Sequence, residues 1–476
     1  MFDAHLAYRA RLEPRTTALI TNLRRVSYAE FDADVSRVAA ALLDLGLRPG
    51  PVAALRIGHG YLQYLALMAL GRIGVCSSVG YDHGADLNLT DLPPGDEGEL
   101  AGKPALRLPR GWLEEVLAAP VRDLPRPDVD PDALGRVLLS SGTTRKPRRV
   151  GLTWRRIEAG IHGAVTVYAH RHKGVWIPLT SPESMLGHSQ VLSAFSLGAA
   201  VLNGVAIPDL PPLLEALEPG ILSLTPSHLR QLLTHLPEDF SPRPGWMITA
   251  AGTVLPLGVA REARLRITPD VRIIYGATEA GLSATGPASG LETAPNLLGW
   301  VPPGAEAEVV DDDGQPVPDG QQGELRVRGE RTVSGYLDDP DGTAERFRGG
   351  WFYTRDLVRR LPDGRLVIDG RVDDRMNLSG LKILPTVLEN PASECPGVLD
   401  VAAFAVPDPQ GFDHAWLAVV AAPDFERESL LRHLARYRDV PTPHFAWIDE
   451  IPRNAMGKVE RAKLSDAVLA LTRGGA

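Results

Sequence analysis

The sequence is poor in cysteine and lacks long apolar runs. Its two cysteines, Cys76 and Cys395, cannot form a disulfide framework and match no metal-ligand spacing. The longest nearly apolar stretch, residues 192–207, is interrupted by Ser196 and Asn203 and is shorter than the roughly 20 residues that a membrane crossing needs. The first residues also lack the apolar centre of a signal peptide. We therefore expect a cytoplasmic protein without a membrane span.

Basic side chains are outnumbered by acidic ones. The 476 residues include 50 basic and 59 acidic side chains, which gives a net charge of −9. This balance argues against a nucleic-acid partner or a general coat for anionic membranes. Six of the basic residues are lysines and the others are arginines. A polyanionic ligand must therefore find a local basic site on this chain.

The apolar pattern predicts an α/β fold. Residues 28–45 and 61–70 have the spacing of helices, and residues 51–57 have that of a buried strand. Strand-like runs followed by helical patterns recur at residues 137–139, 199–205, 221–224, 247–249 and 271–274. Such alternation is typical of parallel sheets covered by helices. After Gly299, short alternating segments with Asp-Gly turns predict antiparallel hairpins.

The segment from residue 137 to 150 carries the clearest chemical signal. A buried strand runs into hydroxyls and a glycine, and four cations follow within five residues. Hydroxyls and loop amides can hold phosphate oxygens, and the cations can neutralise them. The segment is not a standard P-loop, because no G-x-x-x-x-G-K-[ST] is present. Without further context, a solvated basic loop is the competing interpretation.

Five segments together carry a family resemblance. SSGTTRKPRRV, which begins at Ser140, resembles the phosphate-loop signature of the adenylate-forming superfamily, which includes acyl-CoA synthetases and peptide-synthetase adenylation domains. YGATEAG at residues 275–281 resembles its adenine and magnesium motif, and GWFYTRD at 350–356 its ribose motif. GRVDDRMNLSGLK at 370–382 resembles the hinge, and PRNAMGK at 452–458 the loop with the catalytic lysine. The five follow one another in the order that the family has.

The resemblance implies a fold and two domains. It implies an α/β protein whose large N-terminal adenylation domain, residues 1–372, contains parallel α/β subdomains and a small β-barrel-like subdomain. A small mobile α+β domain, residues 373–476, would follow and carry the catalytic lysine. The C-terminal domain would swing between two half-reactions about Asp373.

The resemblance also implies a role for individual residues. Lys458, Glu279 and Thr278 would be catalytic, with Glu279 as the Mg²⁺ ligand and Lys458 stabilising charge as the acyl-adenylate forms. ATP or AMP would be bound by eleven residues: Ser140, Ser141, Gly142, Thr143, Thr144, Lys146, Arg148, Tyr275, Gly276, Asp356 and Arg371. Gly380 and Lys382 would lie near the channel for the thiol acceptor. The acid pocket would include Ser184, Met185, Gly187, Ala251, Gly252 and Ala277.

Two departures from the family pattern bear on the activity. The phosphate loop commonly has glycine where this chain has Arg145 and Arg149. Two arginines imply either a changed loop path or extra charge on the pyrophosphate. Amino-acid-activating relatives carry an aspartate where this chain has Met185, although Glu183 is only two residues away. Because a buried ammonium needs a carboxylate partner, we expect a substrate without an α-amino group.

The expected activity is that of an AMP-forming acid–thiol ligase of the acyl-CoA synthetase type. It would join a small carboxylic acid to a thiol with ATP and Mg²⁺, and coenzyme A is the expected acceptor. The phosphopantetheine arm of an acyl carrier protein is the alternative. A catalytically impaired nucleotide-binding homologue is a third possibility, motivated by Arg145 and Arg149. A serine hydrolase is disfavoured, because S-x-x-K at residues 379–382 has no S-D-N or K-T-G partner.

Overall fold

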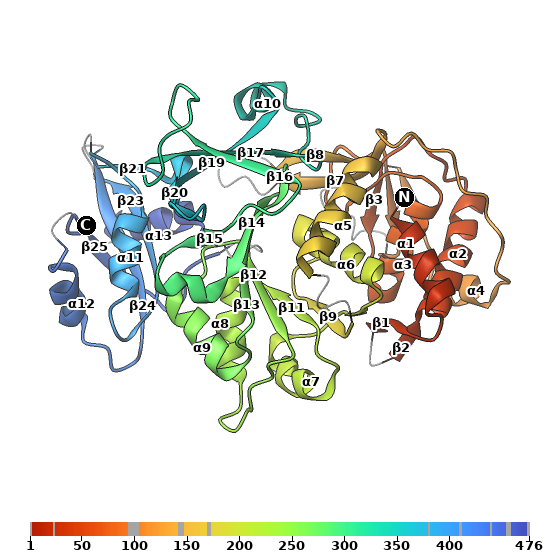
Figure 1. The fold of residues 1–476 in the computed structure, drawn as a ribbon, viewed down its shortest axis with the longest axis horizontal. Helices are drawn as coiled ribbons and strands as arrows, with labels where there is room; N and C mark the ends of the chain where they lie inside the picture. Colours follow the sequence, from red (N-terminus) through yellow and green to blue (C-terminus); the bar gives the residue numbers. More distant parts are fainter. Residues whose placement is uncertain are drawn as a thin grey trace. The chain divides into compact units, whose positions relative to one another are not determined.

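The computed structural model describes most of the chain. The described residues are 2–21, 24–93, 104–140, 147–168, 173–378, 381–408, 412–437, 440–453 and 458–473. They form two compact units (Figure 1). The first unit comprises residues 1–307 and 326–353, and the second comprises 308–325 and 354–476. No helix in the described ranges has both the length and the apolar character that a membrane crossing requires.

The first unit contains two sheets that are parallel except at their edges. In the described residues the first sheet has the order β14 (Gly281–Pro287), β13 (Val271–Ala277), β12 (Met247–Ala251), β11 (Ile221–Leu224), β9 (Val175–Pro178), β10 (Ala200–Leu202), β1 (Thr17–Thr21) and β2 (Arg24–Ser27). The second has the order β6 (Ala105–Arg107), β5 (Leu87–Thr90), β3 (Ala53–Arg56), β4 (Ser77–Val79), β7 (Leu134–Ser140) and β8 (Arg148–Thr153). Strands β14, β2 and β8 are the antiparallel edges.

Helices connect these strands, as parallel pairing requires. In the first unit they are α1 (Asp3–Leu12), α2 (Tyr28–Asp44), α3 (Gly60–Arg72), α4 (Trp112–Ala118), α5 (Trp154–Tyr168), α6 (Met185–Leu197), α7 (Leu210–Ala216), α8 (Pro226–His235), α9 (Leu257–Arg266) and α10 (Pro340–Arg346). Helix α2 shows why they form. Ser27 caps its start by accepting a hydrogen bond from Glu30 N, and Phe31, Val35, Val38 and Leu42 are buried along one face.

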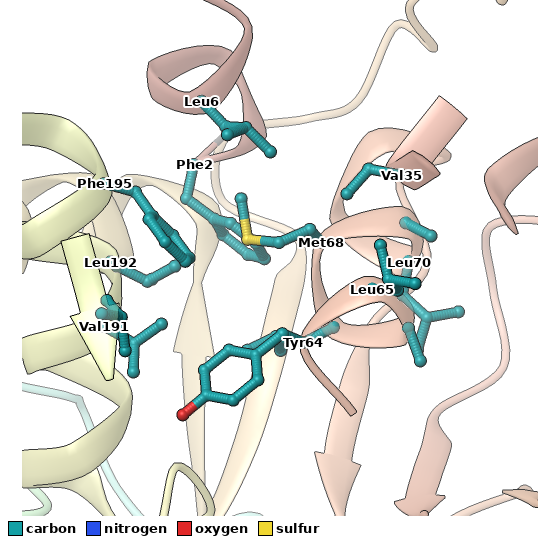
Figure 2. Close-up of a cluster of buried hydrophobic side chains, with 14 of the residues drawn as sticks. Phe2, Leu6, Val35, Tyr64, Leu65, Met68, Leu70, Val191, Leu192 and Phe195 are labelled. Atoms are coloured by element: carbon teal, nitrogen blue, oxygen red, sulfur yellow. The ribbon is translucent and has the colours of Figure 1, made fainter. Parts of the chain in front are cut away.

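The apolar core of the first unit joins the two sheets through helices. Figure 2 shows Phe2 and Leu6 of the α1 segment beside Val191 and Phe195 of α6 and Met68 of α3. A Cβ at Gly71 would lie 2.7 Å from the Phe2 ring, so only glycine admits the ring at that point. Burying each of these large side chains contributes about 1.5–3 kcal/mol. This packing holds α6, the helix that begins beside the candidate acid pocket.

In the described ranges the second unit is built from three helices and from strands that pair mostly antiparallel, with β24 and β25 as a parallel pair. β16 (Ala305–Val310), β17 (Gln322–Gly329) and β19 (Trp351–Arg360) each cross the boundary between the units, and β20 (Leu366–Arg371) pairs with β19. β21 (Met376–Leu378) pairs with β22 (Leu381–Ile383), and β24 (Asp413–Ala421) lies between β23 (Val398–Pro407) and β25 (His444–Trp447). The helices are α11 (Thr386–Ser393), α12 (Arg427–Leu434) and α13 (Arg461–Arg473).

The predicted α/β class with parallel sheets is confirmed. The alternating segments after Gly299 also form strands, at β16, β17 and β20. Four short elements complete the described first unit: η3 (Ile207–Asp209), η4 (Ala288–Glu292), β15 (Leu297–Gly299) and β18 (Phe347–Arg348). The predicted domain boundary at residues 372 and 373 lies inside the second unit, in the 3-10 turn η5 (Val372–Asp374). It stays a prediction about which part moves.

Candidate active site

The predicted magnesium ligand lies at the tip of a hairpin. Residues 278–280 connect β13 to β14, and Gly281 has a φ of 71°, the left-handed conformation that closes a three-residue hairpin loop. A Cβ at Gly276 would lie 2.2 Å from the Gly281 carbonyl oxygen, so glycine is required where the strands approach. Glu279 is only 7% exposed in this loop. A carboxylate is thus held at the carboxyl end of β13.

A second segment, residues 331–339, fastens this loop, and we call it the bridging segment. Tyr336 Oη donates to Glu279 Oε1 at 2.8 Å, and Val333 N donates to the Glu279 carbonyl at 2.9 Å. Burial, and then the nearby Glu279 carboxylate, raises the pKa of Tyr336, so the phenol remains a donor. Farther along, Leu337 N donates to the Arg149 carbonyl at 3.0 Å. The bridging segment therefore connects the Glu279 loop to the β7–β8 hairpin.

The β7–β8 hairpin carries the predicted phosphate loop. Ser140, the last residue of β7, pairs with Arg148, the first residue of β8. The residues between them that were predicted to bind phosphate, namely Ser141, Gly142, Thr143, Thr144 and Lys146, lie outside the described residues, as does Arg145. Arg148 Nε lies 2.7 Å from Asp339 Oδ2, and its guanidinium lies 4.8 Å from the centre of the Tyr336 ring.

Arg149 is enclosed by acidic side chains. Its Nε lies 2.8 Å from Oδ1 of the buried Asp82, and its Nη1 lies 2.7 Å from Oδ2 of Asp338. A Cβ at Gly84 would lie 2.5 Å from the Arg149 guanidinium carbon. Burial opposes the charge, but the two carboxylates outweigh it and raise the pKa of Arg149. The charge of Arg149 is therefore matched by carboxylates of the protein itself.

The predicted acid-pocket residues of α6 begin the helix. Ser184 is its N-cap: its Oγ accepts from Gly187 N at 3.1 Å and donates to the Ser181 carbonyl at 2.7 Å. A Cβ at Gly187 would lie 2.1 Å from that same carbonyl oxygen. Met185 follows in the first turn, with its Sδ 2.8 Å from Nη2 of Arg331. The Ser184 hydroxyl therefore serves the cap.

The other predicted pocket residues lie at strand ends. Ala251 is the last residue of β12, Gly252 follows it with a φ of 99°, and Ala277 is the last residue of β13. Because β12 and β13 are parallel neighbours, their carboxyl ends share one edge of the sheet. Ligands bind at this edge in α/β sheets. The structure thus brings Ala251, Gly252 and Ala277 together with the Glu279 loop.

The predicted ribose residues lie in the second unit. Asp356 of β19 is paired with Arg371 of β20, and Arg371 Nη1 donates to Asp356 Oδ1 at 2.7 Å. Asp373, the predicted hinge, accepts from both Nε and Nη2 of Arg355 at 3.1 and 3.0 Å. The backbone of Arg355 has a φ of 66°, which residues other than glycine rarely adopt. Ion pairs therefore connect Asp356 of β19 to Arg371 of β20, and Asp373 to Arg355 of β19.

The predicted catalytic lysine belongs to the same unit and lies next to an isolated bridge. Lys458 precedes Val459, which forms an isolated antiparallel bridge with Arg453. Arg453 Nη2 donates to both carboxylate oxygens of Asp400, at 2.9 and 3.1 Å. Of the two residues predicted for the thiol channel, Lys382 pairs with Asn377 between β22 and β21, and Gly380 lies outside the described residues.

Sequence reasoning missed Tyr336, Arg331 and Asp82. Tyr336 lies in GYLDDP, whose polar ending indicates a surface turn, and nothing in that pattern points to Glu279. Arg331 lies in RGERT, which has the pattern of an exposed segment. Asp82 lies in a polar segment with no motif that points to a cation. Its partner Arg149 was flagged, but pairing residues that are 67 positions apart requires the fold.

Comparison with known proteins identifies the family. The family model described as AMP-binding enzyme matches residues 6–86 and 84–337. The chain belongs to this family. It is 28% identical to indoleacetate–CoA ligase of Aromatoleum aromaticum over 95% of both chains. It is 30% identical to phenyloxazoline synthase MbtB of Mycobacterium tuberculosis over 96% of this chain, which spans 34% of that protein.

The fold of this AMP-binding enzyme has solved counterparts. ATP-bound MatB from Rhodopseudomonas palustris superposes with a TM-score of 0.86 at 22% identity, over 98% of this chain and 99% of that one. The adenylate-forming family predicted from the five motifs is thereby confirmed, as is the enzyme class of an AMP-forming acid–thiol ligase. The role of each residue remains to be proposed.

Proposed function

We propose that this AMP-binding enzyme activates a carboxylic acid without an α-amino group and transfers its acyl group to coenzyme A. In the first step a carboxylate oxygen bonds to the α-phosphorus of ATP and the bond to pyrophosphate breaks. In the second step the thiol sulfur bonds to the acyl carbon, the bond to AMP breaks and the thiol proton is released. The nucleophiles belong to the substrates, so the protein acts by positioning and by electrostatics.

The contact between Met185 and Arg331 carries the proposal about the acid. Amino-acid-activating relatives have a carboxylate at this point of α6, whereas here a guanidinium lies 2.8 Å from Met185 Sδ. The nearby Glu183 accepts from Gly80 N at 3.0 Å and attracts the buried Arg136. A substrate ammonium would thus meet a cation where it needs an anion.

The donors around Glu279 fit a magnesium ion that is held largely by nucleotide phosphates. Mg²⁺ usually takes one or two protein carboxylates and completes its shell with water and phosphate. Glu279 supplies such a carboxylate, Thr278 adds a hydroxyl, and no cluster of three or more acidic, histidine or cysteine ligands occurs in the described ranges. When bound, the ion would neutralise phosphate charge. Tyr336 would hold Glu279 in place for it.

The remaining roles follow the family motifs. Tyr275 and Gly276 would contact the adenine, and Ser140 and Arg148 would border the phosphate loop. Asp356 would accept the ribose hydroxyls, with its carboxylate oriented by Arg371. Lys458 would reach the carboxylate and the α-phosphate, and Asp373 would be the pivot of the C-terminal domain.

Carrier-protein loading is the second candidate function. The hinge motif favours coenzyme A, as does the similarity to indoleacetate–CoA ligase along 95% of the chain. The identity to MbtB is 30%, against 28% to indoleacetate–CoA ligase, and this similarity favours a phosphopantetheine arm. A catalytically impaired homologue is the third candidate. Glu279, Asp356, Arg371 and Lys458 are all present, which argues against it.

ATP–pyrophosphate exchange with a broad panel of acids tests the adenylation step. We expect acid-dependent exchange in the wild type and a loss of at least about 100-fold in Lys458→Ala, by analogy with removal of one preorganised charge donor. Lys463→Ala is the matched control, because Lys463 is an exposed lysine that pairs with Glu460 at 2.7 Å. No exchange with any acid in the wild type would refute the proposal.

Thioester formation tests the acceptor. The wild type is incubated with ATP, an accepted acid and coenzyme A, and the thioester is detected by mass spectrometry. Accumulation of acyl-AMP without thioester would reject free coenzyme A and favour a carrier protein.

A further inference from the structure

Arg331 occupies a slot that two glycines leave open. Its side chain leaves the bridging segment and passes between α5 and β14. A Cβ at Gly160 would lie 2.6 Å from the guanidinium carbon, and a Cβ at Gly281 would lie 2.4 Å from Arg331 Cδ. Any larger residue at either position would displace the side chain. The backbone is therefore shaped to admit an arginine here.

The guanidinium in this slot has few partners. Nη2 donates to Ser189 Oγ at 2.7 Å and lies 2.8 Å from Met185 Sδ. Nε is buried and has no hydrogen-bond partner in the described residues. No carboxylate forms an ion pair with Arg331 in that part of the chain. Burial alone lowers the pKa of Arg331 to about 10, and it stays cationic at neutral pH.

An enclosed cation without an anion destabilises a folded protein. Two other enclosed arginines of the first unit are matched: Arg72 pairs with Asp3 and Asp32, and Arg149 pairs with Asp82 and Asp338. Arg331, like Arg136, forms no ion pair with a carboxylate in the described residues, and it contacts two elements of the candidate acid pocket. These are the first turn of α6, through Met185, and the end of the Glu279 loop, through Gly281.

The surroundings of Arg331 add further positive potential. The N-terminus of α6 carries a partial positive charge. Arg136 is 2% exposed, and its guanidinium and that of Arg331 both disfavour protonation of His188. Glu183, the acidic group that acts on Arg136, is already engaged with Gly80 N. An anion entering this side of the pocket would therefore be attracted by several groups.

We propose that Arg331 binds a second anionic group of the acid substrate, so that the enzyme selects acids with a carboxylate or sulfonate remote from the carboxylate that is adenylated. The inference rests on the proposed function and narrows its substrate class. Arg331 acts here as a specificity residue, because it binds the end of the acid that does not react. The guanidinium fork suits a planar carboxylate, which it can bind through two donors.

Matched pairs of acids test the selection. Each pair consists of a dicarboxylic acid and its half-amide, such as terephthalate and 4-carbamoylbenzoate or adipate and its monoamide, which have nearly the same shape. A third arm replaces the remote carboxylate by a sulfonate. In ATP–pyrophosphate exchange we expect the wild type to prefer the dianion over the half-amide by at least about tenfold in kcat/KM, since charge-assisted hydrogen bonds are the strong ones. In Arg331→Met we expect this preference to vanish while exchange with half-amides is retained.

Thermal stability separates a specificity role from a structural one. Without ligand, Arg331→Met should melt at or above the wild-type temperature, because it removes an unmatched cation. The dianionic acid should raise the melting temperature of the wild type and leave that of the variant unchanged. Arg149→Met is the matched control, since it leaves the buried Asp82 unpaired and should melt well below the wild type.

Three results would overturn the proposal, and they are distinguishable from failure of the proposed function. Exchange without preference for dianions in the wild type would refute it and leave the function standing. An equal loss with dianions and half-amides in Arg331→Met would place the guanidinium on the reacting carboxylate. A melting temperature as low as that of Arg149→Met would make Arg331 a structural residue. Absence of exchange with every acid would instead refute the proposed function.

Discussion

Arg149 and Arg331 are both enclosed cations of the first unit, and they differ in what surrounds them. Arg149 has the carboxylates of Asp82 and Asp338 at 2.8 and 2.7 Å. Arg331 has a hydroxyl and a thioether, and in the described residues no carboxylate. A matched charge contributes to the architecture. A cation that has no carboxylate partner and lies beside a candidate pocket is available to an anionic ligand.

The comparison also explains a departure from the family pattern. Arg149 stands where the family commonly has glycine. Its guanidinium lies against Gly84 and pairs with the Asp82 carboxylate. The ion pair thus connects the β7–β8 hairpin to the segment between β4 and β5.

Removing Arg149 should have the largest effect. Arg149→Met leaves Asp82, which is 1% exposed, without its cation, and breaking a buried pair from one side lowers stability by about 3–5 kcal/mol. The double variant Arg149→Met with Asp82→Asn should recover much of this loss, because no buried charge remains. Urea unfolding of the variants measures both. Arg155→Met, which removes an exposed pair with Asp132, should behave like the wild type. Equal stability of Arg149→Met and Arg155→Met would contradict the assignment.

The hydrogen bond from Tyr336 to Glu279 should have an intermediate effect. Tyr336→Phe deprives a buried carboxylate of its donor, and hydrogen bonds to charged groups contribute about 1.5–3 kcal/mol. We expect a lower melting temperature and a higher Mg²⁺ requirement in pyrophosphate exchange. Tyr437→Phe is the control, because Tyr437 donates to Glu394 at 2.7 Å on the surface. An unchanged Mg²⁺ dependence in Tyr336→Phe would remove Glu279 from the metal site.

Local patterns predicted much of the fold. The helix expected at residues 28–45 is α2, and the strand expected at 221–224 is β11, because apolar spacing and burial agree there. The β13–β14 hairpin was not predicted, since glycines and small residues replace the alternation of a strand. The motifs located Glu279, but its partner Tyr336 is 57 residues away and is brought to it by the bridging segment. A hydrogen bond between residues so far apart in the chain leaves no periodic pattern in the sequence.

His188 provides the prediction with the smallest expected effect on stability. It is a buried imidazole that can remain neutral in the folded protein. It is 1% exposed, and neither ring nitrogen has a hydrogen-bond partner in the described residues. Burial, followed by the charges of Arg136 and Arg331, lowers its pKa well below 6.5. Below about pH 6.5 the unfolded chain therefore binds a proton that the folded protein does not. Stability should fall as the pH drops from about 6.5 towards the lowered native pKa, by up to about 1.4 kcal/mol per pH unit.

The variant His188→Leu should remove this dependence. Leucine suits the apolar contact with Phe2, whose ring centre lies 6.2 Å from that of His188. Melting temperatures between pH 7.5 and 5 should fall less steeply in His188→Leu than in the wild type. His235→Leu, at the exposed end of α8, should follow the wild-type curve. Parallel curves for all three proteins would mean that His188 takes up a proton as readily in the folded state as in the unfolded chain. Arg149 and Arg331 cannot respond to pH in this way, because a guanidinium keeps its charge. The charge of Arg331 can be balanced only by an anion, whereas His188 avoids the cost of burial by staying neutral.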